Sequence, residues 1–591
     1  MSAQLQDELD SASAPETDQV DSQAISLSAD LQAQFQSTLD SLQADRAVAR
    51  LWAKDATFWT NRDEAKWLGW LSIVDRELTN LAEYEAFASE VRREGFSNVV
   101  LLGMGGSSLG PEVLGEIIGS AKGAPRLYIL DSTDPAQIRA LESAIDINNT
   151  MFIVSSKSGS TLEPNIFKDY FFAHVHESFG DKAGDHFVAV TDPGSAMEKA
   201  ARNQNFRRIF FGDPTIGGRY SVLSAFGLAP SAAIGIDLKR FLTLTHRMID
   251  ACGADASAAE NPGVLLGTAF GVAARAGRDK VTIIPSPKLA DFGAWAEQLI
   301  AESTGKNGKA LIPVDDEPLG TPEVYGADRI FVHLKLSGDR DLAQDSSIER
   351  LENAGHPVVR IEVKSPDHLG QEFFRWEVAT AIAGGLIGIN PFDQPDVEAS
   401  KVKTRELTNA FEKSGALPPE SPAFAQDGIE IYTDEKNADA LRAAGAGDDL
   451  LSWIKAHLNR AGACDYVALL AYIKRNAEHI AALREMRTAI RDARHVATCV
   501  GFGPRFLHST GQAYKGGPNT GVFLQITTAH PDPLAIPGYR ADFGVVEAAQ
   551  ARGDMGVLVE RDRRVMRIHF ADGDVDGGLK QLSSAIARAI H

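Results

Sequence analysis

Five short apolar runs, each followed by a turn and a helical pattern, constrain the fold of this chain most. The runs cover residues 98–102, 126–130, 151–155, 186–190 and 208–211. Polar residues do not alternate with apolar ones inside them, so both faces of each predicted strand must be buried. This pattern is typical of a doubly wound parallel sheet with helices on both faces, and we predict an α/β fold.

The rest of the chain repeats the α/β pattern twice. Strands are predicted at 280–284, 329–334 and 358–363, and, after a proline-rich stretch at 417–424, a third pattern combines a long helix at 466–493 with strands at 495–500, 520–527, 555–559 and 565–570. A chain of 591 residues is long enough for several domains. We predict a disordered acidic tail or linker over 1–40, two doubly wound parallel-sheet subdomains over 41–232 and 233–415, and a C-terminal α/β domain over 425–591.

The charge of the chain limits its partners. There are 59 Lys and Arg against 80 Asp and Glu, a net charge of −21, and nine of the acids lie in residues 1–45, which contain no Lys or Arg. Nucleic acid and anionic membranes repel such a chain, so we predict neither as a partner. Three widely spaced cysteines, no signal peptide and no apolar run long enough to span a bilayer predict a soluble, cytoplasmic protein.

Two loops that follow predicted strands are suited to binding a phosphate. The first, 103–110, reads Gly-Met-Gly-Gly-Ser-Ser-Leu-Gly, and the second, 155–164, reads Ser-Ser-Lys-Ser-Gly-Ser-Thr-Leu-Glu-Pro. Helix N-termini attract anions, and the carboxyl ends of parallel strands share one edge of a sheet, so both loops are expected to grip one phosphate. The first loop also approaches a dinucleotide fingerprint with Asp131 as the ribose-binding acid, but Ser108 stands where the third glycine would be.

These loops and three later motifs resemble the sugar isomerase domain family and, within it, the glucose-6-phosphate isomerases. The later motifs are Gly-Gly-Arg-Tyr-Ser at 217–221, Glu-Ser-Thr-Gly-Lys at 302–306, and Asn-Pro-Phe-Asp-Gln at 390–394. The resemblance covers about 45–410, in the family's order. The acidic leader and the C-terminal unit are similar to the isomerase half of fused transaldolase and glucose-6-phosphate isomerase proteins, which implies a fused or associated transaldolase as a partner. The sequence itself shows no transaldolase half.

The resemblance implies an isomerase of glycolysis and gluconeogenesis that interconverts glucose 6-phosphate and fructose 6-phosphate by moving a proton between adjacent carbons through a cis-enediolate. Glu302 matches the family's base, Arg219 the cation that stabilises the enediolate, and Lys401 a lysine near the ring oxygen. Supporting and substrate-binding positions match Glu163, Gln298 and Gln394. The phosphate site matches Gly106, Ser107, Ser156, Lys157, Ser158 and Thr161.

The ring-opening histidine is where the sequence departs from the family. Related isomerases carry it in a Leu-His-Ser-x-Gly-Gln segment between the base and the Phe-Asp-Gln motif, but here that segment lies at 507–512, in the C-terminal unit. We predict that this unit supplies His508 to the active site. Two alternatives stay open: His333 opens the ring, or the C-terminal unit has a separate binding role.

The implied reaction requires neither a metal ion nor a cofactor, and we predict none. His174, His176 and Glu177 look like metal ligands, but residues two apart on a predicted helix face away from each other.

The alternatives to the isomerase are an enzyme that also accepts mannose 6-phosphate and a sugar-phosphate sensor without catalysis. Family members are commonly homodimers whose active site takes a residue from the neighbouring subunit. If His508 of the same chain fills that role, the active site depends less on a homodimer.

Overall fold

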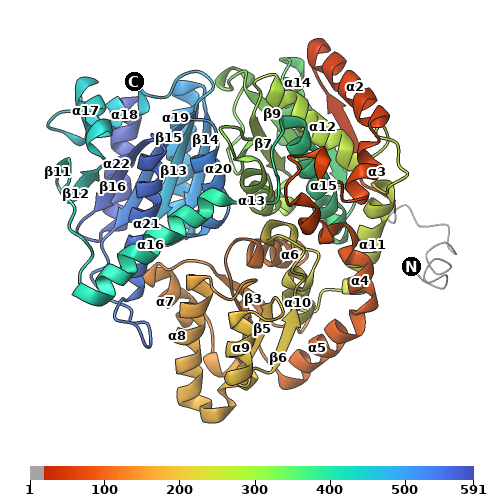
Figure 1. The fold of residues 1–591 in the computed structure, drawn as a ribbon. Helices are drawn as coiled ribbons and strands as arrows, with labels where there is room; N and C mark the ends of the chain where they lie inside the picture. The colour runs from red at the N-terminus through yellow and green to blue at the C-terminus, as the bar shows by residue number, and fades with distance from the viewer. Residues whose placement is uncertain (1–18, 591) are drawn as a thin grey trace.

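Three β-sheets, each covered by helices, form three lobes in the computed structural model, which describes residues 19–590 (Figure 1). We refer to them as the first, second and third units, in the order in which most of their strands occur in the chain. This arrangement confirms the predicted α/β class, with two parallel-sheet units and a C-terminal α/β unit. The exact domain boundaries stay a prediction.

The first unit is a five-stranded parallel sheet in the order β3-β2-β4-β5-β6. The order reverses between β2 and β4, and ligands of such sheets bind at this reversal, above the carboxyl ends of the strands. Both predicted phosphate loops leave the sheet here. The strands are β2 (Asn98–Leu102), β3 (Arg126–Leu130), β4 (Thr150–Ser155), β5 (Phe187–Thr191) and β6 (Arg208–Phe211). The helices are α6 (Leu109–Ile117), α7 (Pro135–Ala144), α8 (Leu162–Phe179), α9 (Ala196–Asn203) and α10 (Ala225–Ala233).

The second unit repeats this strand order and adds an antiparallel edge strand, β1 (Ser22–Ser26), giving β1-β10-β9-β7-β8. Its buried strands continue the apolar core of the first unit, so the two units share one core. The strands after β1 are β7 (Lys280–Pro285), β8 (Ile312–Val314), β9 (Arg329–Leu336) and β10 (Val358–Val363). The principal helices are α11 (Leu238–Ala251), α12 (Pro262–Arg275), α13 (Phe292–Thr304), α14 (Leu342–Asn353) and α15 (Leu369–Ile387).

The predicted disordered tail over 1–40 is wrong for residues 19–40, and residues 1–18 lie outside the described part. Strand β1 (Ser22–Ser26) pairs antiparallel with β10, and helix α2 (Ala29–Ala44) buries Leu31, Phe35, Leu39 and Leu42. The few apolar residues of this acidic segment fall on one face of α2, and this face is sufficient to pack the helix against the protein core. The side chain of Asp21 is buried and contacts His368 and the backbone N–H of Lys364.

The third unit has a six-stranded sheet in the order β11-β12-β16-β15-β13-β14. Two sequence predictions are wrong here. Residues 466–472 form an interior strand of the sheet rather than the start of a helix, and residues 555–559 lie inside a helix rather than a strand. The strands are β11 (Phe424–Gln426), β12 (Ile429–Tyr432), β13 (Tyr466–Tyr472), β14 (Ala497–Phe502), β15 (Gly521–Thr528) and β16 (Arg564–Phe570). The helices are α17 (Glu435–Ala443), α18 (Leu450–Leu458), α19 (Ala477–Arg494), α20 (Gly511–Gly516), α21 (Phe543–Glu560) and α22 (Val575–Ala589).

The long helix α16 (Pro395–Ser414) joins the second unit to the third. The predicted second subdomain, 233–415, includes the residues of α16. In the structure, α16 packs along α21 of the third unit (Figure 1). Apolar clusters also link the third unit to the second, through Ala301 and Tyr514, and to the first, through Phe167 and Phe543. The third unit is thus packed against both others. Among the helices of residues 19–590, none is both long and apolar enough to cross a membrane.

Candidate active site

A cleft of about 530 Å³ opens beside the serine-rich loop of the first unit. This size falls within the range of about 300–1,000 Å³ that is typical of small-molecule sites. The loop contributes Ser158, Ser160 and Thr161, and the N-terminus of α8 follows directly. Ser158 and Ser160 share a hydrogen bond of 2.8 Å between their hydroxyl oxygens. Hydroxyls and a helix N-terminus at one end of a cleft are suited to holding an anion.

Glu302 and Arg219 form an ion pair between the second and first units, and neither of them is among the residues that line the cleft. Glu302 lies near the C-terminal end of α13, and its Oε1 is 3.3 Å from Nη1 of Arg219. The side chain of Arg219 is 1% exposed. Its guanidinium also donates to Ser303 Oγ at 2.8 Å and to Gln394 Oε1 at 3.0 Å. The other Nη of Arg219 donates to the carbonyls of Pro391 and Asp393, so the cation is held in a fixed orientation beside the carboxylate.

Gln298 connects this pair to the third unit. It lies one helical turn before Glu302 on the same face of α13, and its Nε2 donates to Glu302 Oε2 at 3.1 Å. The same Nε2 donates to the backbone carbonyl of His508 at 2.8 Å. The arginine, the carboxylate and the histidine loop therefore form one connected arrangement.

His508 lies in the cleft and contacts Glu163. Its Nε2 is 3.0 Å from Glu163 Oε1, and both residues line the cleft. Glu163 stands in the first turn of α8, where the helix dipole favours a negative charge. Burial raises the pKa of Glu163, but the neighbouring His508, a backbone hydrogen bond and Lys401 together outweigh burial, so the pKa is lower than usual. A histidine that is oriented by a buried carboxylate is suited to proton transfer.

His333, the alternative ring-opening residue, is far less suited. It lies in the middle of β9, with its side chain buried, and its Nε2 is 3.2 Å from Gln344 Oε1. Burial lowers the pKa of His333. It is not among the residues that line the cleft.

Two residues to which the sequence analysis gave no role support the site. Gln550 of α21 donates from Nε2 to Glu163 Oε1 at 2.6 Å, and its own Oε1 accepts from Thr133 Oγ1 at 2.7 Å. A lone glutamine in a helix carries no signal in the sequence. Lys306, in contrast, belongs to the Glu-Ser-Thr-Gly-Lys motif; burial lowers the pKa of its ammonium group to about 7, and Nζ donates to the carbonyl of Asn390 at 2.6 Å.

Four of the six predicted phosphate residues do not line the cleft: Gly106, Ser107, Ser156 and Lys157. The Lys157 ammonium is 2.6 Å from Asp192 Oδ2 and donates to the carbonyl of Asp213 at 2.8 Å, so its charge is already balanced. The Ser156 hydroxyl is buried without a hydrogen-bond partner. Gly106 faces the backbone of Gly218 rather than the cleft.

Lys401 lies on α16 at the rim of the cleft. Its Nζ is 2.8 Å from Glu398 Oε1, and about a third of its side chain is exposed. An exposed pair of this kind is weak, so the ammonium group can turn to a ligand at little cost.

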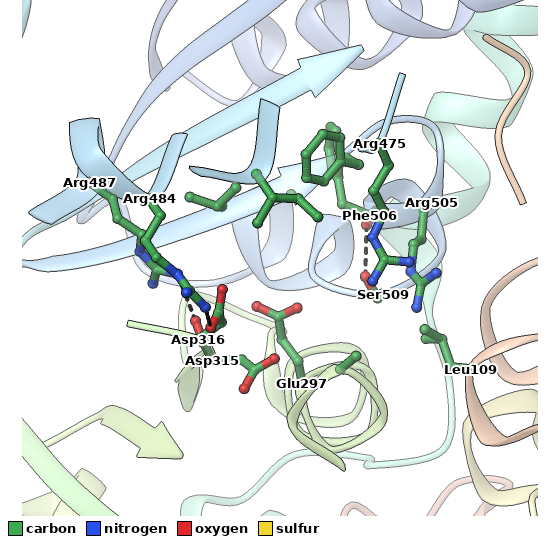
Figure 2. A pocket seen from close by; sticks show the side chains of 15 residues that line it. Leu109, Glu297, Asp315, Asp316, Arg475, Arg484, Arg487, Arg505, Phe506 and Ser509 are labelled. Carbon is green, nitrogen blue, oxygen red and sulfur yellow. Dashed lines mark hydrogen bonds and ion pairs between the residues drawn. The ribbon is translucent and has the colours of Figure 1, made fainter. Parts of the chain in front are cut away.

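A second, charged cavity of about 140 Å³ lies where α13 meets the third unit. Figure 2 shows Glu297 of α13 pointing into it, between Arg484 and Arg487 on one side and Arg475 and Arg505 on the other. Burial and the nearby Asp315 raise the pKa of Glu297 to about 8.

Arg505 also reaches Asp131 of the first unit, with 3.0 Å between Nη1 and Oδ2. Ser108 Oγ donates to the same Oδ2 at 3.3 Å. Asp131 is therefore committed to contacts within the protein, and not available to the ribose that the dinucleotide interpretation required.

Comparison with known proteins identifies related sequences. Residues 87–313 match the family described as phosphoglucose isomerase. A glucose-6-phosphate isomerase of Rubrobacter xylanophilus is 30% identical over 361 residues, which cover 53% of this chain and 83% of the relative. A probable glucose-6-phosphate isomerase of Methanococcus maripaludis is 28% identical over 373 residues, covering 56% of this chain and 82% of the relative.

Solved structures share the fold. A hypothetical protein from Thermus thermophilus superposes with a TM-score of 0.57 at 24% identity, covering 65% of this chain and 99% of that protein. A glucose-6-phosphate isomerase from Chlamydia trachomatis gives a TM-score of 0.50 at 22% identity, covering 62% of this chain and 78% of that protein.

Proposed function

This chain belongs to the phosphoglucose isomerase family and interconverts glucose 6-phosphate and fructose 6-phosphate, and we propose that it does so at the junction of its three units, with residues from each. The observation that carries this proposal is the connected arrangement of Arg219, Glu302 and Gln298 with His508 and Glu163.

Glu302 is proposed as the base that moves the proton between the two carbons. Its carboxylate is held from both sides, by Arg219 on Oε1 and by Gln298 on Oε2, so its position does not depend on the substrate. A fixed base avoids reorganisation at the moment of proton transfer. The proton leaves C2 of the aldose, resides on Glu302, and returns to C1 to give the ketose.

Arg219 is proposed to stabilise the enediolate that forms between these two steps. Its guanidinium is always charged, almost fully buried and fixed by Gln394, Ser303 and two backbone carbonyls. A preorganised cation in a water-poor site stabilises a developing negative oxygen far better than bulk water does. Because Arg219 also contacts Glu302, base and cation act on neighbouring atoms of the substrate.

The pair His508 and Glu163 is proposed to open the sugar ring. The Glu163 carboxylate keeps the imidazole of His508 oriented. It also stabilises the imidazolium that forms when His508 takes a proton. Lys401 at the rim is proposed to interact near the ring oxygen. The serine-rich loop, with Ser158 and Thr161, is proposed to hold the phosphate, and Ser107, Ser156 and Lys157 to support the loops from behind.

Because His508 comes from the same chain as Glu302, we propose that one copy of the chain suffices for a complete site. A homodimer would then add stability without adding a catalytic residue. A cytoplasmic location and an associated or fused transaldolase stay predictions.

The proposed function is tested with the purified full chain, fructose 6-phosphate and EDTA, by following the formation of glucose 6-phosphate. Glu302→Gln is expected to lower kcat by about 10²–10⁴-fold, the usual contribution of a general base. The matched control is Glu297→Gln, the same exchange on the same helix, whose side chain faces the second cavity and is expected to keep full activity. An inactive wild type refutes the isomerase, and an active Glu302→Gln refutes the base.

The ring-opening role is tested with a pair of histidine variants. His508→Ala is expected to lower kcat on the cyclic sugar by about 10²-fold or more, whereas His333→Gln is expected to retain most of it. The opposite result would assign ring opening to His333, and equal losses in both variants would contradict the proposed role of His508.

A further inference from the structure

Three potential metal ligands meet where the first and third units touch, outside the set of residues that line the cleft. Asp134 follows β3 and begins α7 in the first unit. His530 follows β15, and Glu547 lies on α21, both in the third unit. Each offers one ligand atom, and these atoms all lie within 4.8 Å of one another.

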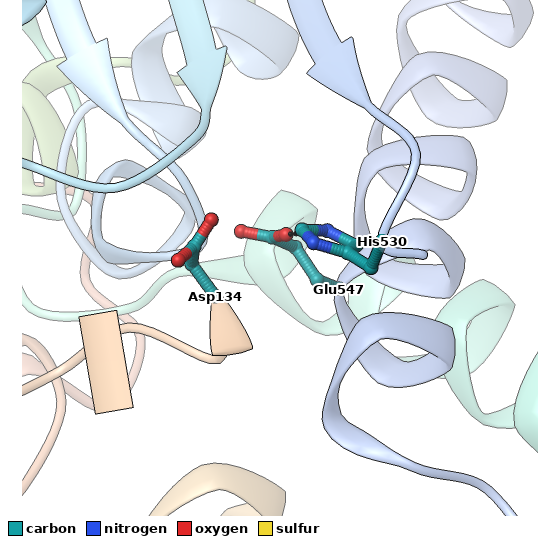
Figure 3. Close-up of side chains that lie close together, drawn as sticks. All are labelled: Asp134, His530 and Glu547. Carbon is teal, nitrogen blue, oxygen red and sulfur yellow. Dashed lines mark hydrogen bonds and ion pairs between the residues drawn. The ribbon is translucent and has the colours of Figure 1, made fainter. Parts of the chain in front are cut away.

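The Glu547 carboxylate lies between the other two side chains (Figure 3). Its Oε2 is 2.6 Å from Nε2 of His530, and its Oε1 is buried and has no hydrogen-bond partner among residues 19–590. The Glu547 side chain is 2% exposed. A buried carboxylate oxygen without a partner loses its hydration and gains nothing in return, so it signals a group that the protein atoms alone do not supply.

The charges of the surrounding side chains also favour a bound cation at this position. Asp134 and Glu547 are both buried, and within residues 19–590 no Lys or Arg forms an ion pair with either carboxylate. The side chain that faces both of them is the imidazole of His530, whose Nε2 is 2.6 Å from Glu547 Oε2. Two adjacent buried carboxylates are costly together unless a positive charge lies between them.

The side chains are held in place before any ligand arrives. Asp134 Oδ1 caps α7 by accepting from the backbone N–H of Gln137 at 2.7 Å. Glu547 is in the interior of α21, one turn before Gln550, which is itself tied to Thr133 next to Asp134. Such fixed orientation reduces the cost of assembling a coordination shell.

We propose that Asp134, His530 and Glu547 bind one divalent transition-metal ion that joins the first unit to the third. One imidazole nitrogen and two carboxylate oxygens form a ligand set suited to Zn²⁺, Mn²⁺ or Co²⁺, with water completing the shell. Metal–ligand distances of about 2.0–2.2 Å require the three side chains to draw closer around the ion than they are without it. The ion replaces the hydrogen bond between His530 and Glu547.

Access to this site is open from two sides. His530 and Glu547 line a cavity of about 190 Å³, and Asp134 and His530 line another of about 630 Å³. Both cavities have room for water molecules, so an ion can enter and keep water ligands.

The experiment measures binding of the metal alone to the full-length protein after treatment with EDTA and dialysis. Titration calorimetry with Zn²⁺, Mn²⁺ and Co²⁺ is expected to give one ion per chain for at least one of them, and that ion is expected to raise the temperature of unfolding. The absence of stoichiometric binding of all three ions to wild type overturns the proposal, and this result requires no variant. Isomerase activity does not enter the measurement, so the proposal fails or stands independently of the catalytic one.

Variants locate the binding. Asp134→Asn and Glu547→Gln are each expected to weaken affinity by at least about tenfold, because each removes a charged ligand with little change of shape. Asp576→Asn is the matched control, since Asp576 lines the larger cavity but is exposed and pairs with His479. Circular dichroism without metal checks that each variant is folded. Equal binding by wild type and Asp134→Asn overturns the assignment, as does loss of binding in Asp576→Asn alone.

Discussion

The glycine-rich loop of the first unit offers the sharpest test of how the site is assembled. The sequence suggested that Gly106 contacts the phosphate, but a Cβ at this position would lie 1.9 Å from the backbone oxygen of Gly218 and 2.3 Å from its carbonyl carbon. Gly106 therefore allows the loop after β2 to touch the backbone immediately before Arg219. We expect Gly106→Ala to damage the site through Arg219 rather than through the phosphate.

The size of the effect follows from this overlap. Carbon–oxygen contacts below 3.0 Å are essentially never found, so the two backbones must separate by about 1 Å, and overpacking of this kind costs about 1–3 kcal/mol. Arg219 follows Gly218 directly and would move with it relative to Glu302. Since a misplacement of about 1 Å at a reacting group costs on the order of 10²-fold in rate, we expect kcat of Gly106→Ala to fall by about that factor.

The assay combines thermal unfolding with steady-state kinetics. Gly217→Ala is the control for stability, because Gly217 belongs to the facing segment, has an ordinary φ of −67°, and has nothing within 4 Å of its potential Cβ. We expect the unfolding temperature to fall in Gly106→Ala and to stay unchanged in Gly217→Ala. If Gly106→Ala keeps both its unfolding temperature and a kcat within twofold of wild type, the close approach of the two loops does not position Arg219.

Three further predictions concern other parts of the chain. Gln550→Ala removes a hydrogen bond to the Glu163 carboxylate and is expected to lower kcat by about 10–100-fold with little change in KM; an unchanged kcat would contradict its positioning role. Asp21→Ala removes a buried carboxylate that contacts His368 and accepts from the backbone N–H of Lys364, and it is expected to cost about 1–3 kcal/mol in urea unfolding; an unchanged free energy of unfolding would contradict the docking of this segment. Burial lowers the pKa of His457 to about 3, so the unfolded state binds a proton that the folded state does not, and stability is expected to fall by about 1.4 kcal/mol per pH unit from about pH 6.5 downward. His457→Gln should reduce this slope, and an identical slope would refute the reasoning.

Part of the candidate site could be predicted because its residues belong to short motifs of the family that the sequence resembles. Glu302, Arg219 and Gln298 were assigned from the sequence, and the structure brings them together through contacts between the first and second units. His508 was assigned although it lies in an unexpected part of the chain, because its motif was preserved. Gln550 was missed, since its role depends on α21 lying beside Glu163, a contact across 387 positions that no local pattern encodes.

The fold was less predictable where apolar residues run without interruption. Residues 466–472 were expected to be helical, but they form a strand with β14 on one side and β15 on the other. Residues 555–559 were expected to be a strand, yet α21 is packed between α16 and the sheet, and so it needs few polar positions there. A short apolar run is compatible with either element, and its neighbours in the tertiary structure decide between them.

The third unit can deliver His508 accurately because its backbone touches that of the second unit. A Cβ on Gly305, which ends α13 just after Glu302, would lie 2.2 Å from the Cα of Ala513 in α20. Gln512 strengthens this contact by donating to the carbonyl of Gly305 at 2.8 Å and accepting from the backbone N–H of Asp396 at 2.9 Å. The position of the histidine relative to the base is therefore set by packed backbone and not by the reach of flexible side chains. The same tight contact fixes the loop that carries His508 relative to Glu302, although the two residues are far apart in the chain.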